Sequence, residues 1–265
     1  MNKYELYITQ INVHTTTKCT LKCKKCSWSF PYFEPHIHSD ADLIVHSLEG
    51  VFQVYENVHE LSIAGAEAFL HPGINEIITG AAKYCNQFDV MRIVTNGTYI
   101  PNKSILNTIS SLPCDVFVRV DDYGKLSGKK QEIVSALKEY GIKTDLRPYN
   151  EEEQAFGGWI DLGEYKYKNY SKEQLKDVFR RCKMPLDCSV LWDGRLYNCP
   201  YCISGFKLGK IPMARREYVD LFDDTTIEDK RALIKAWKDE PFDGCAYCNG
   251  YDPEASPRIP AAEQL

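Results

Sequence analysis

The chain has 265 residues, of which 44% are hydrophobic and 26% are charged, a composition typical of one large soluble domain or of one domain with a small appendage. Its 32 basic and 37 acidic side chains give a net charge of −5, which argues against a general nucleic-acid-binding protein, because such proteins need a basic excess. No apolar stretch reaches the roughly 18 residues of a membrane span, and the N-terminal segment MNKYELYITQINV lacks the continuous apolar run of a signal peptide, so we expect a cytoplasmic protein.

The first 150 residues alternate between strand-like and helix-like segments. The predicted strands are residues 7–14, 59–64, 89–95, 115–120 and 142–147. The predicted helices between them are residues 40–55, 72–85, 102–111 and 129–140. Strands that alternate with helices at this spacing predict an α/β fold with a parallel sheet, either open or closed into a barrel. Both arrangements place ligands at the carboxyl ends of the strands.

The sequence changes character after Ser171. A short helix over residues 171–182 leads into a cysteine-rich segment with a hairpin turn expected at Asp193 and Gly194. A second helix is predicted over residues 226–238, and the tail beyond it has little periodicity. We therefore predict a first domain over residues 1–174 and a second, smaller domain over residues 175–265.

Cysteine is unusually frequent, with 11 residues, and in a reducing compartment this number favours metal or cofactor ligation over disulfides. Cys19, Cys23 and Cys26 have the spacing C-x3-C-x2-C and directly follow the first predicted strand. Three thiolates on one loop can bind three irons of a [4Fe–4S] cluster and leave the fourth iron open to another ligand. A zinc ion is the alternative, with a nearby histidine as its fourth ligand, namely His14, His36 or His38.

The segment TTKCTLKCKKC resembles the signature of the radical S-adenosylmethionine (SAM) enzymes, which lies after the first strand of a partial (β/α)6 barrel of the TIM type. The resemblance implies that Cys19, Cys23 and Cys26 hold a [4Fe–4S] cluster to which SAM binds. It implies reductive cleavage of SAM to a 5′-deoxyadenosyl radical, which abstracts a hydrogen atom from the substrate. It also implies an external reductant such as a flavodoxin or a ferredoxin.

Two further segments resemble the SAM-binding parts of this family. Residues 65–68 (Gly-Ala-Glu-Ala) follow the second strand, where the family has Gly-Gly-Glu-Pro and holds the amino group of SAM. Residues 95–97 (Thr-Asn-Gly) follow the third strand, where the family approaches the ribose and carboxylate of SAM. The family usually has an aromatic residue just before the third cysteine, whereas this chain has Lys25 there. The SAM-binding residues implied by the resemblance are therefore Gly65, Ala66, Glu67, Thr95, Asn96 and, near the adenine, Trp28.

The C-terminal region contains six further cysteines: Cys182, Cys188, Cys199, Cys202, Cys245 and Cys248. By spacing alone, the two C-x2-C pairs among them also fit a zinc ribbon. The order of a cysteine, a hairpin, a second cysteine and a C-x2-C pair after a helix resembles the twitch extension, the short form of the SPASM domain, which binds one auxiliary [4Fe–4S] cluster. The resemblance implies as ligands Cys182, Cys199, Cys245 and Cys248. Cys188 and Cys202 are then extra: one of them could replace Cys182, or one could face the substrate as a hydrogen donor.

Polar side chains at the predicted strand ends are candidates for substrate binding. Arg147, just before Pro148, and Arg119 in the fourth strand are candidates for holding an anionic or polyhydroxyl substrate. The compact chain favours a small, sugar- or cyclitol-like molecule. We expect a dehydrogenase that oxidises a carbinol, with the auxiliary cluster as acceptor of the second electron. The alternatives are an epimerase in which Cys188 or Cys202 returns the hydrogen, a peptide maturase, and a zinc-binding structural or adaptor protein without catalysis.

Overall fold

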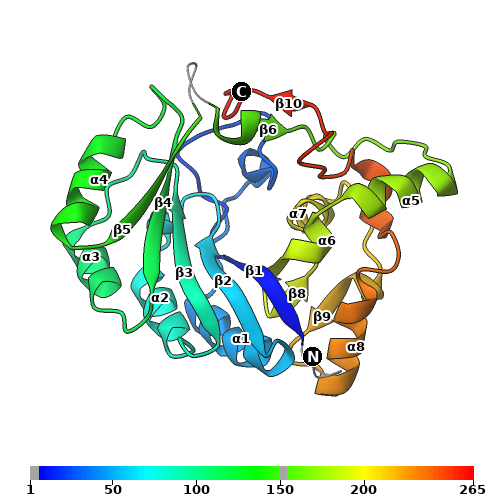
Figure 1. The fold of residues 1–265 in the computed structure, drawn as a ribbon, viewed down its shortest axis with the longest axis horizontal. Helices are drawn as coiled ribbons and strands as arrows, with labels where there is room; N and C mark the ends of the chain where they lie inside the picture. The colour runs from blue at the N-terminus through cyan, green and yellow to red at the C-terminus, as the bar shows by residue number, and fades with distance from the viewer. Residues whose placement is uncertain (1–5, 150–153) are drawn as a thin grey trace.

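The computed structural model describes residues 6–149 and 154–265, which form a curved sheet with helices along its outer face (Figure 1). The first five strands are β1 (Tyr7–His14), β2 (Asn57–Ala64), β3 (Phe88–Thr95), β4 (Val116–Asp122) and β5 (Lys143–Pro148). The helices that connect them are α1 (Ala41–Val54), α2 (Ile74–Ala82), α3 (Lys103–Ser110) and α4 (Lys130–Glu139). All neighbouring pairs among β1–β5 are parallel. The predicted α/β fold with a mostly parallel sheet is thus confirmed.

The sheet continues beyond β1 into the C-terminal region. β7 (Cys188–Trp192) pairs in parallel with β1, and β8 (Arg195–Tyr197) and β9 (Tyr218–Asp220) follow in antiparallel order. The complete strand order is β5-β4-β3-β2-β1-β7-β8-β9. Strands from both sides of residue 175 therefore belong to one sheet, and the division into residues 1–174 and 175–265 stays a prediction.

Short-range sequence signals explain where several elements begin and turn. The Asp40 side chain caps α1 by accepting a hydrogen bond from Leu43 N at 2.8 Å, and Asn102 caps α3 by accepting one from Ile105 N at 3.0 Å. The turn between β7 and β8 has positive φ angles at Asp193 (49°) and Gly194 (74°), as a two-residue hairpin of type I′ requires. The apolar faces of α1–α4 pack on strands β1–β5 and form the main core.

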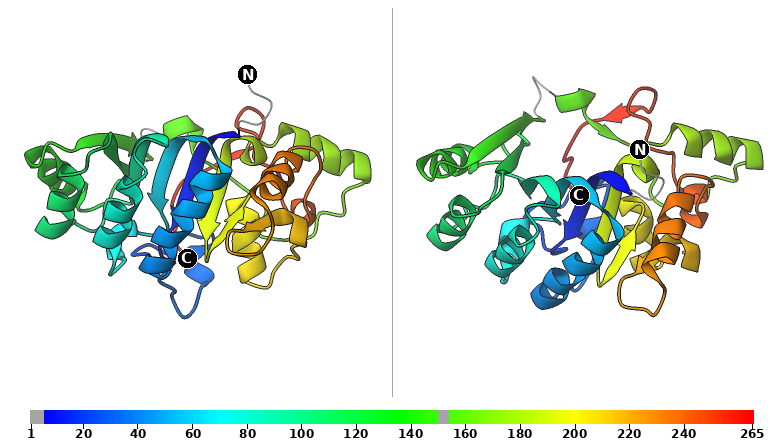
Figure 2. Two further views of the ribbon diagram at one scale, coloured as in Figure 1. Left: turned by 90° about the horizontal axis from the view of Figure 1, so that it is seen from below. Right: turned by 60° about the horizontal axis from the view of Figure 1, so that its bottom comes forward.

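The other elements lie along the remaining side of the molecule, and Figure 2 shows them and the row α1–α4 from two further directions. The helices are α5 (Lys172–Arg181), α6 (Met184–Asp187), α7 (Pro200–Lys207) and α8 (Ile227–Ala236). Short 3-10 helices cover Phe30–Tyr32, Ala68–Leu70, Ala155–Gly157, Arg215–Glu217 and Asp243–Tyr247. Two short strands, β6 (Trp159–Ile160) and β10 (Arg258–Ile259), pair antiparallel as a separate sheet. In the described part of the chain, no helix is both long and apolar enough to cross a membrane.

Candidate active site

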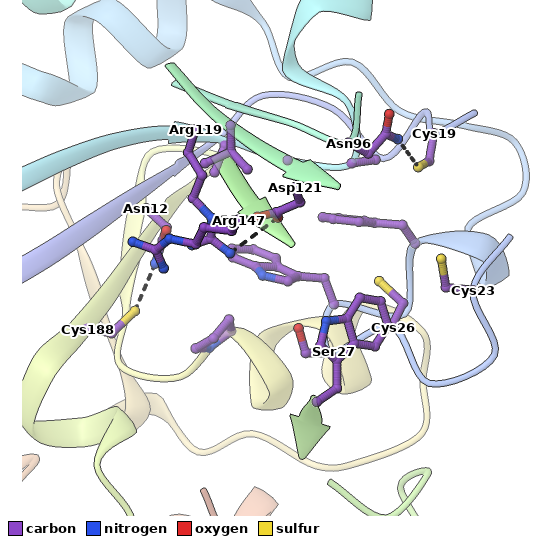
Figure 3. A pocket seen from close by; sticks show the side chains of 18 of the residues that line it. Asn12, Cys19, Cys23, Cys26, Ser27, Asn96, Arg119, Asp121, Arg147 and Cys188 are labelled. Carbon is purple, nitrogen blue, oxygen red and sulfur yellow. Dashed lines mark hydrogen bonds and ion pairs between the residues drawn. The ribbon is translucent and has the colours of Figure 1, made fainter. Parts of the chain in front are cut away.

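A cavity of about 510 Å³ lies on the inner face of the curved sheet (Figure 3). Its walls come from β1, β3, β4 and β5, from the loops after β1 and β2, from α6 and from the first residue of β7. The site residues expected from the sequence that line it are Cys19, Cys23, Cys26, Trp28, Gly65, Ala66, Asn96, Arg119, Arg147 and Cys188. The fold thus brings residues from distant parts of the sequence to one cavity.

The loop after β1 presents three thiols to this cavity. Cys19 Sγ accepts hydrogen bonds at 3.4 Å from a backbone N–H and from the side-chain amide of Asn96. Cys23 Sγ accepts one at 3.3 Å from the side-chain amide of Gln264. N–H donors at these two sulfurs suit iron-bound thiolates, which can only accept. By their chemistry these residues fit a [4Fe–4S] cluster.

The same thiols are protonated when no metal is bound. Burial raises the pKa of Cys19 to about 11 and that of Cys23 to about 12, and it also raises the pKa of Cys26. Metal binding at this loop must therefore release protons.

Within residues 6–149 and 154–265, no three Cys, His, Asp or Glu side chains lie close enough together to share a single metal ion. In a [4Fe–4S] cluster, by contrast, each thiolate binds a different iron.

The segment after β2 forms a backbone edge beside the cysteine loop. Ala66 N donates to Thr16 O at 2.9 Å, which fixes this edge to the loop after β1. Gly65 has a φ of +149°, and a Cβ atom there would lie 2.8 Å from both Thr15 Oγ1 and Thr16 O. Only glycine allows this close approach of two backbone segments. Gly65 and Ala66 can therefore present backbone groups to a ligand in the cavity.

Glu67 and Thr95 lie behind the cavity wall. Glu67 is fully buried, and its Oε2 accepts hydrogen bonds from Thr95 Oγ1 at 3.0 Å and from Asn96 N at 2.9 Å. Its Oε1 has no hydrogen-bond partner among the described residues. Burial raises the pKa of Glu67 to about 7, although the hydrogen bonds from Asn96 and Thr95 oppose that shift. The carboxylate thus joins the ends of β2 and β3 and orients Asn96, which does line the cavity.

Lys25 lies just before the third cysteine, and its side chain forms ion pairs. Lys25 Nζ forms ion pairs with Glu164 at 2.7 Å and with Asp161 at 3.3 Å. Trp28 lines the cavity instead and stacks on Phe30, with 5.5 Å between the ring centroids. Trp28 therefore supplies an aromatic surface in the cavity.

Three arginines on neighbouring strands line the opposite part of the cavity. Arg119 on β4 and Arg147 on β5 were expected from the sequence, and Arg92 on β3 was not. The Arg119 Nε atom lies 2.7 Å from Asp121 Oδ1, and the Arg147 Nε atom lies 2.8 Å from Asp145 Oδ2. Each guanidinium is thus matched by a carboxylate on its own strand.

Arg92 is the most deeply buried of the three, with 7% of its surface exposed. Its Nη2 lies 2.9 Å from Glu60 Oε1 and donates to Ser62 Oγ at 3.2 Å. Burial lowers the pKa of Arg92 to about 10, and Glu60 opposes this shift. The signal available in the sequence was a charged side chain in the middle of the apolar run of residues 90–94.

A second group of thiols lies at α7. The Cys202 thiol interacts with the side chains of Cys199 and Cys245. Cys182 and Cys248 interact electrostatically with the same two cysteines. Backbone N–H groups donate to their sulfurs, from Tyr251 to Cys182 at 3.4 Å and from Gly250 to Cys248 at 3.3 Å. Five thiols, two of which accept backbone N–H donors, fit an iron–sulfur cluster by their chemistry, with one thiol more than four irons need.

Cys188 lines the cavity and also interacts electrostatically with Cys199 of the second thiol group. Its Sγ accepts a hydrogen bond from the side-chain amide of Asn12 at 2.9 Å. Burial raises the pKa of Cys188 to about 12, so its sulfur is a thiol at neutral pH. The structure therefore places Cys202 beside Cys199 and Cys245, and Cys188 at the wall of the cavity (Figure 3), where it also interacts with Cys199.

Comparison with known proteins gives matches among solved structures. The structure of BtrN in complex with AdoMet and 2-DOIA matches with a TM-score of 0.57 and 15% identity, over 98% of this chain and 100% of that chain. Histidine-tagged anSMEcpe with bound AdoMet matches with a TM-score of 0.55 and 13% identity, over 89% of this chain and 84% of that chain. The chain shares its fold with these two AdoMet-bound proteins. No protein-family model and no curated protein sequence matches it.

Proposed function

We propose that this chain is a radical SAM enzyme that abstracts a hydrogen atom from a small, sugar- or cyclitol-like molecule. The observation that carries the proposal is that the three loop thiols of Cys19, Cys23 and Cys26 line the same cavity as the strand arginines, on the inner face of the sheet. AdoMet bound to two proteins of the same fold supports it. We also propose that residues 1–174 form a partial barrel and residues 175–265 a twitch-type domain.

Different residues of the chain would bind the first cluster, SAM and the auxiliary cluster. Cys19, Cys23 and Cys26 would hold a [4Fe–4S] cluster, which with SAM supplies the hydrogen-abstracting radical when a flavodoxin- or ferredoxin-like protein donates an electron. Backbone groups at Gly65 and Ala66, together with Asn96 and Trp28, would bind SAM, with Glu67 and Thr95 fixing Asn96 from behind. Four of Cys182, Cys199, Cys202, Cys245 and Cys248 would hold an auxiliary [4Fe–4S] cluster.

The pairing of the cavity arginines favours a polyhydroxyl substrate over an anionic one. Arg119 and Asp121 both line the cavity and present donors and an acceptor side by side, which suits hydroxyl groups because they both donate and accept. The partner of Arg147, Asp145, lies outside the set of lining residues but engages the Arg147 Nε atom. BtrN, a protein of the same fold, binds 2-DOIA together with AdoMet, which supports a second ligand beside SAM in this fold.

Carbinol oxidation is the reaction that we favour. The carbinol carbon loses one hydrogen atom to the SAM-derived radical, and the remaining substrate radical must lose one proton and one electron to become a carbonyl. Asp121 lines the cavity and can accept the proton. The five-thiol group at α7 would hold the acceptor of the electron.

A second candidate, epimerisation, is favoured by one specific observation. Cys188 lines the cavity as a buried thiol and is held by Asn12. A thiol at this place can return a hydrogen atom to a substrate radical, and an external one-electron reductant would then restore the thiol. The two candidates differ in product. Oxidation lowers the substrate mass by two hydrogens. Epimerisation keeps the mass in ordinary water and introduces deuterium when the reaction runs in D2O.

The proposal is tested by anaerobic purification, with iron and labile sulfide measured per chain and 5′-deoxyadenosine measured after addition of dithionite and SAM. We expect about eight irons with sulfide, as two four-iron clusters require. The joint replacement of Cys19, Cys23 and Cys26 by alanine should remove four irons and all SAM cleavage. Zinc without sulfide, together with no SAM cleavage, would refute the proposal and support a zinc-binding structural protein.

The substrate class is tested separately. We would screen neutral polyhydroxyl and amino-polyhydroxyl rings, each beside its phosphorylated counterpart, for stimulation of SAM cleavage. The Arg–Asp pairs predict that neutral rings stimulate cleavage. Stimulation by the phosphorylated forms alone would contradict this assignment, and stimulation by peptides alone would support a peptide maturase.

A further inference from the structure

The last eight residues of the sequence, 258–265, run from β10 to the loop that carries the first three cysteines. We name this segment the strap. It begins in β10, which pairs with β6 at the side of the cavity where Trp159 lies (Figure 1). It then crosses to the cysteine loop, where Cys23 and Gln264 form an isolated antiparallel bridge. The strap therefore joins two walls of the cavity.

Backbone hydrogen bonds hold the strap on both sides of Cys23. Lys24 N donates to Glu263 O at 2.8 Å, and Leu265 N donates to Lys22 O at 2.8 Å. These bonds pair backbone groups of the loop on either side of Cys23. The strap therefore fixes the backbone at Cys23.

The strap also covers the apolar side of the cysteine loop. Ala262 has 1% of its surface exposed and packs against Leu21 and Cys23. Cys19 and Cys26 are packed against the same small cluster. Apolar contact at all three cysteines keeps water from this side of the loop.

The side chain of Gln264 is oriented by three hydrogen bonds. Its Oε1 accepts from Lys22 N at 2.8 Å, and its Nε2 donates to Ala262 O at 2.7 Å and to Cys23 Sγ at 3.3 Å. The reverse orientation would place Oε1 against a carbonyl oxygen and Nε2 against an N–H donor, so the network permits only one. The amide N–H is therefore aimed at the sulfur of Cys23.

We propose that Gln264 is a positioning residue that tunes the cluster which, on the function proposed above, binds at Cys19, Cys23 and Cys26. An N–H···S hydrogen bond stabilises the extra negative charge of a reduced cluster, and hydrogen bonds to the sulfurs are among the factors that set the reduction potential of such clusters. The Gln264 amide thus raises the potential at which the cluster accepts an electron. Nothing in the sequence pattern indicated this role, because Gln264 lies 241 positions from Cys23.

The test compares two substitutions at position 264 in the anaerobic, cluster-loaded protein. Gln264→Glu keeps an acceptor for Lys22 N and removes the donor to Cys23, whereas Gln264→Met removes both. Glu254→Gln is the control, because it changes an exposed side chain that lies outside the strap. The readout is the midpoint potential from an EPR-monitored redox titration, with the cluster at the first three cysteines identified by the change in its spectrum on addition of SAM.

We expect lower midpoint potentials in both variants at position 264, with the larger shift in Gln264→Glu because it adds a negative charge near the sulfur. The control should keep the wild-type potential. Wild-type potentials in both variants, with full iron content, would overturn the proposal. Loss of these four irons from both variants while the control keeps them would also overturn tuning, since Gln264 would then be needed to build the site.

Failure of the proposal can be told apart from failure of the proposed function. The unmodified protein is measured first, and the absence of a cluster whose EPR spectrum responds to SAM would refute the function itself. With such a cluster present, the comparison at position 264 tests Gln264 alone. If Gln264→Met fails to hold iron, Gln264→Glu carries the comparison, because it keeps the hydrogen bond to Lys22.

Discussion

Replacing Glu67 by glutamine should remove a large pH dependence of stability. The Glu67 side chain is fully buried, and burial raises its pKa from 4.5 to about 7. The folded chain therefore binds this proton more tightly than the unfolded chain does. Glu67 consequently favours folding most below pH 4.5, and its contribution falls as the pH rises to about 7 and stays constant above that value.

The size of the effect follows from the two pKa values. A change from 4.5 to about 7 corresponds to about 3 kcal/mol, at about 1.4 kcal/mol for each pH unit. The glutamine of Glu67→Gln has no proton to lose, so the free energy of unfolding of this variant does not decrease in this way as the pH rises. The amide can still accept from Thr95 and Asn96 through its oxygen. Relative to the unmodified protein, the variant should gain about 2 to 3 kcal/mol between pH 5 and pH 8.

Urea unfolding of the reduced, metal-free chain, followed by tryptophan fluorescence at several pH values, measures this difference. The slope with pH is decisive, because a constant offset only reports how well the amide fits. Glu240→Gln is the matched control, since it makes the same chemical change at an exposed position. A difference between Glu67→Gln and the unmodified protein that stays flat from pH 5 to pH 8 would refute the reasoning.

Three further predictions use the same unfolding measurement. Gly65→Ala should lower the free energy of unfolding by about 2 kcal/mol or more, because the new Cβ would lie 2.8 Å from Thr16 O at a φ of +149°. Gly128→Ala is the control and should lower it far less, because its Cβ would have only one neighbour within 4 Å, at 3.8 Å. Asn102→Ala should cost about 1 kcal/mol through loss of the α3 cap, and an unchanged midpoint would contradict the cap. Arg92→Met should cost about 3 kcal/mol by leaving Glu60 unpaired, and adding Glu60→Gln should recover part of it; strict additivity of the two changes would contradict the pairing.

The parts of the fold that could be predicted are those set by neighbouring residues. Capping by Asp40 and Asn102 and the alternation of apolar residues act over a few positions, so the helices and strands of the first 150 residues were predicted within a few residues. The pairing of β7 with β1 was not predicted, because it joins segments about 180 positions apart and leaves no local pattern. The same reason applies to Gln264, whose partner Cys23 lies near the other end of the sequence.

The site shows the same division between local and long-range information. The spacing of Cys19, Cys23 and Cys26 on one loop is a local signal, and the structure places all three at the cavity. The different surroundings of Cys188 and Cys202 could not be read from spacing alone. Cys202 lies in the first turn of α7 near Cys199, whereas Cys188 begins a strand that faces the cavity.

The place of Cys188 on the sheet limits what it can do. In the β1–β7 register, Cys188 lies opposite Gln10, whereas the cysteine loop follows His14 at the other end of β1. Four residues of strand separate these levels by about 13 Å. Figure 3 accordingly shows Cys188 and Cys19 on opposite sides of the cavity, with Arg119 and Arg147 between them. A substrate held by these arginines would face the first three cysteines on one side and the Cys188 thiol on the other. This is the geometry that removal of hydrogen from one face and its return to the opposite face would require, so Cys188→Ser is the variant that separates epimerisation from oxidation.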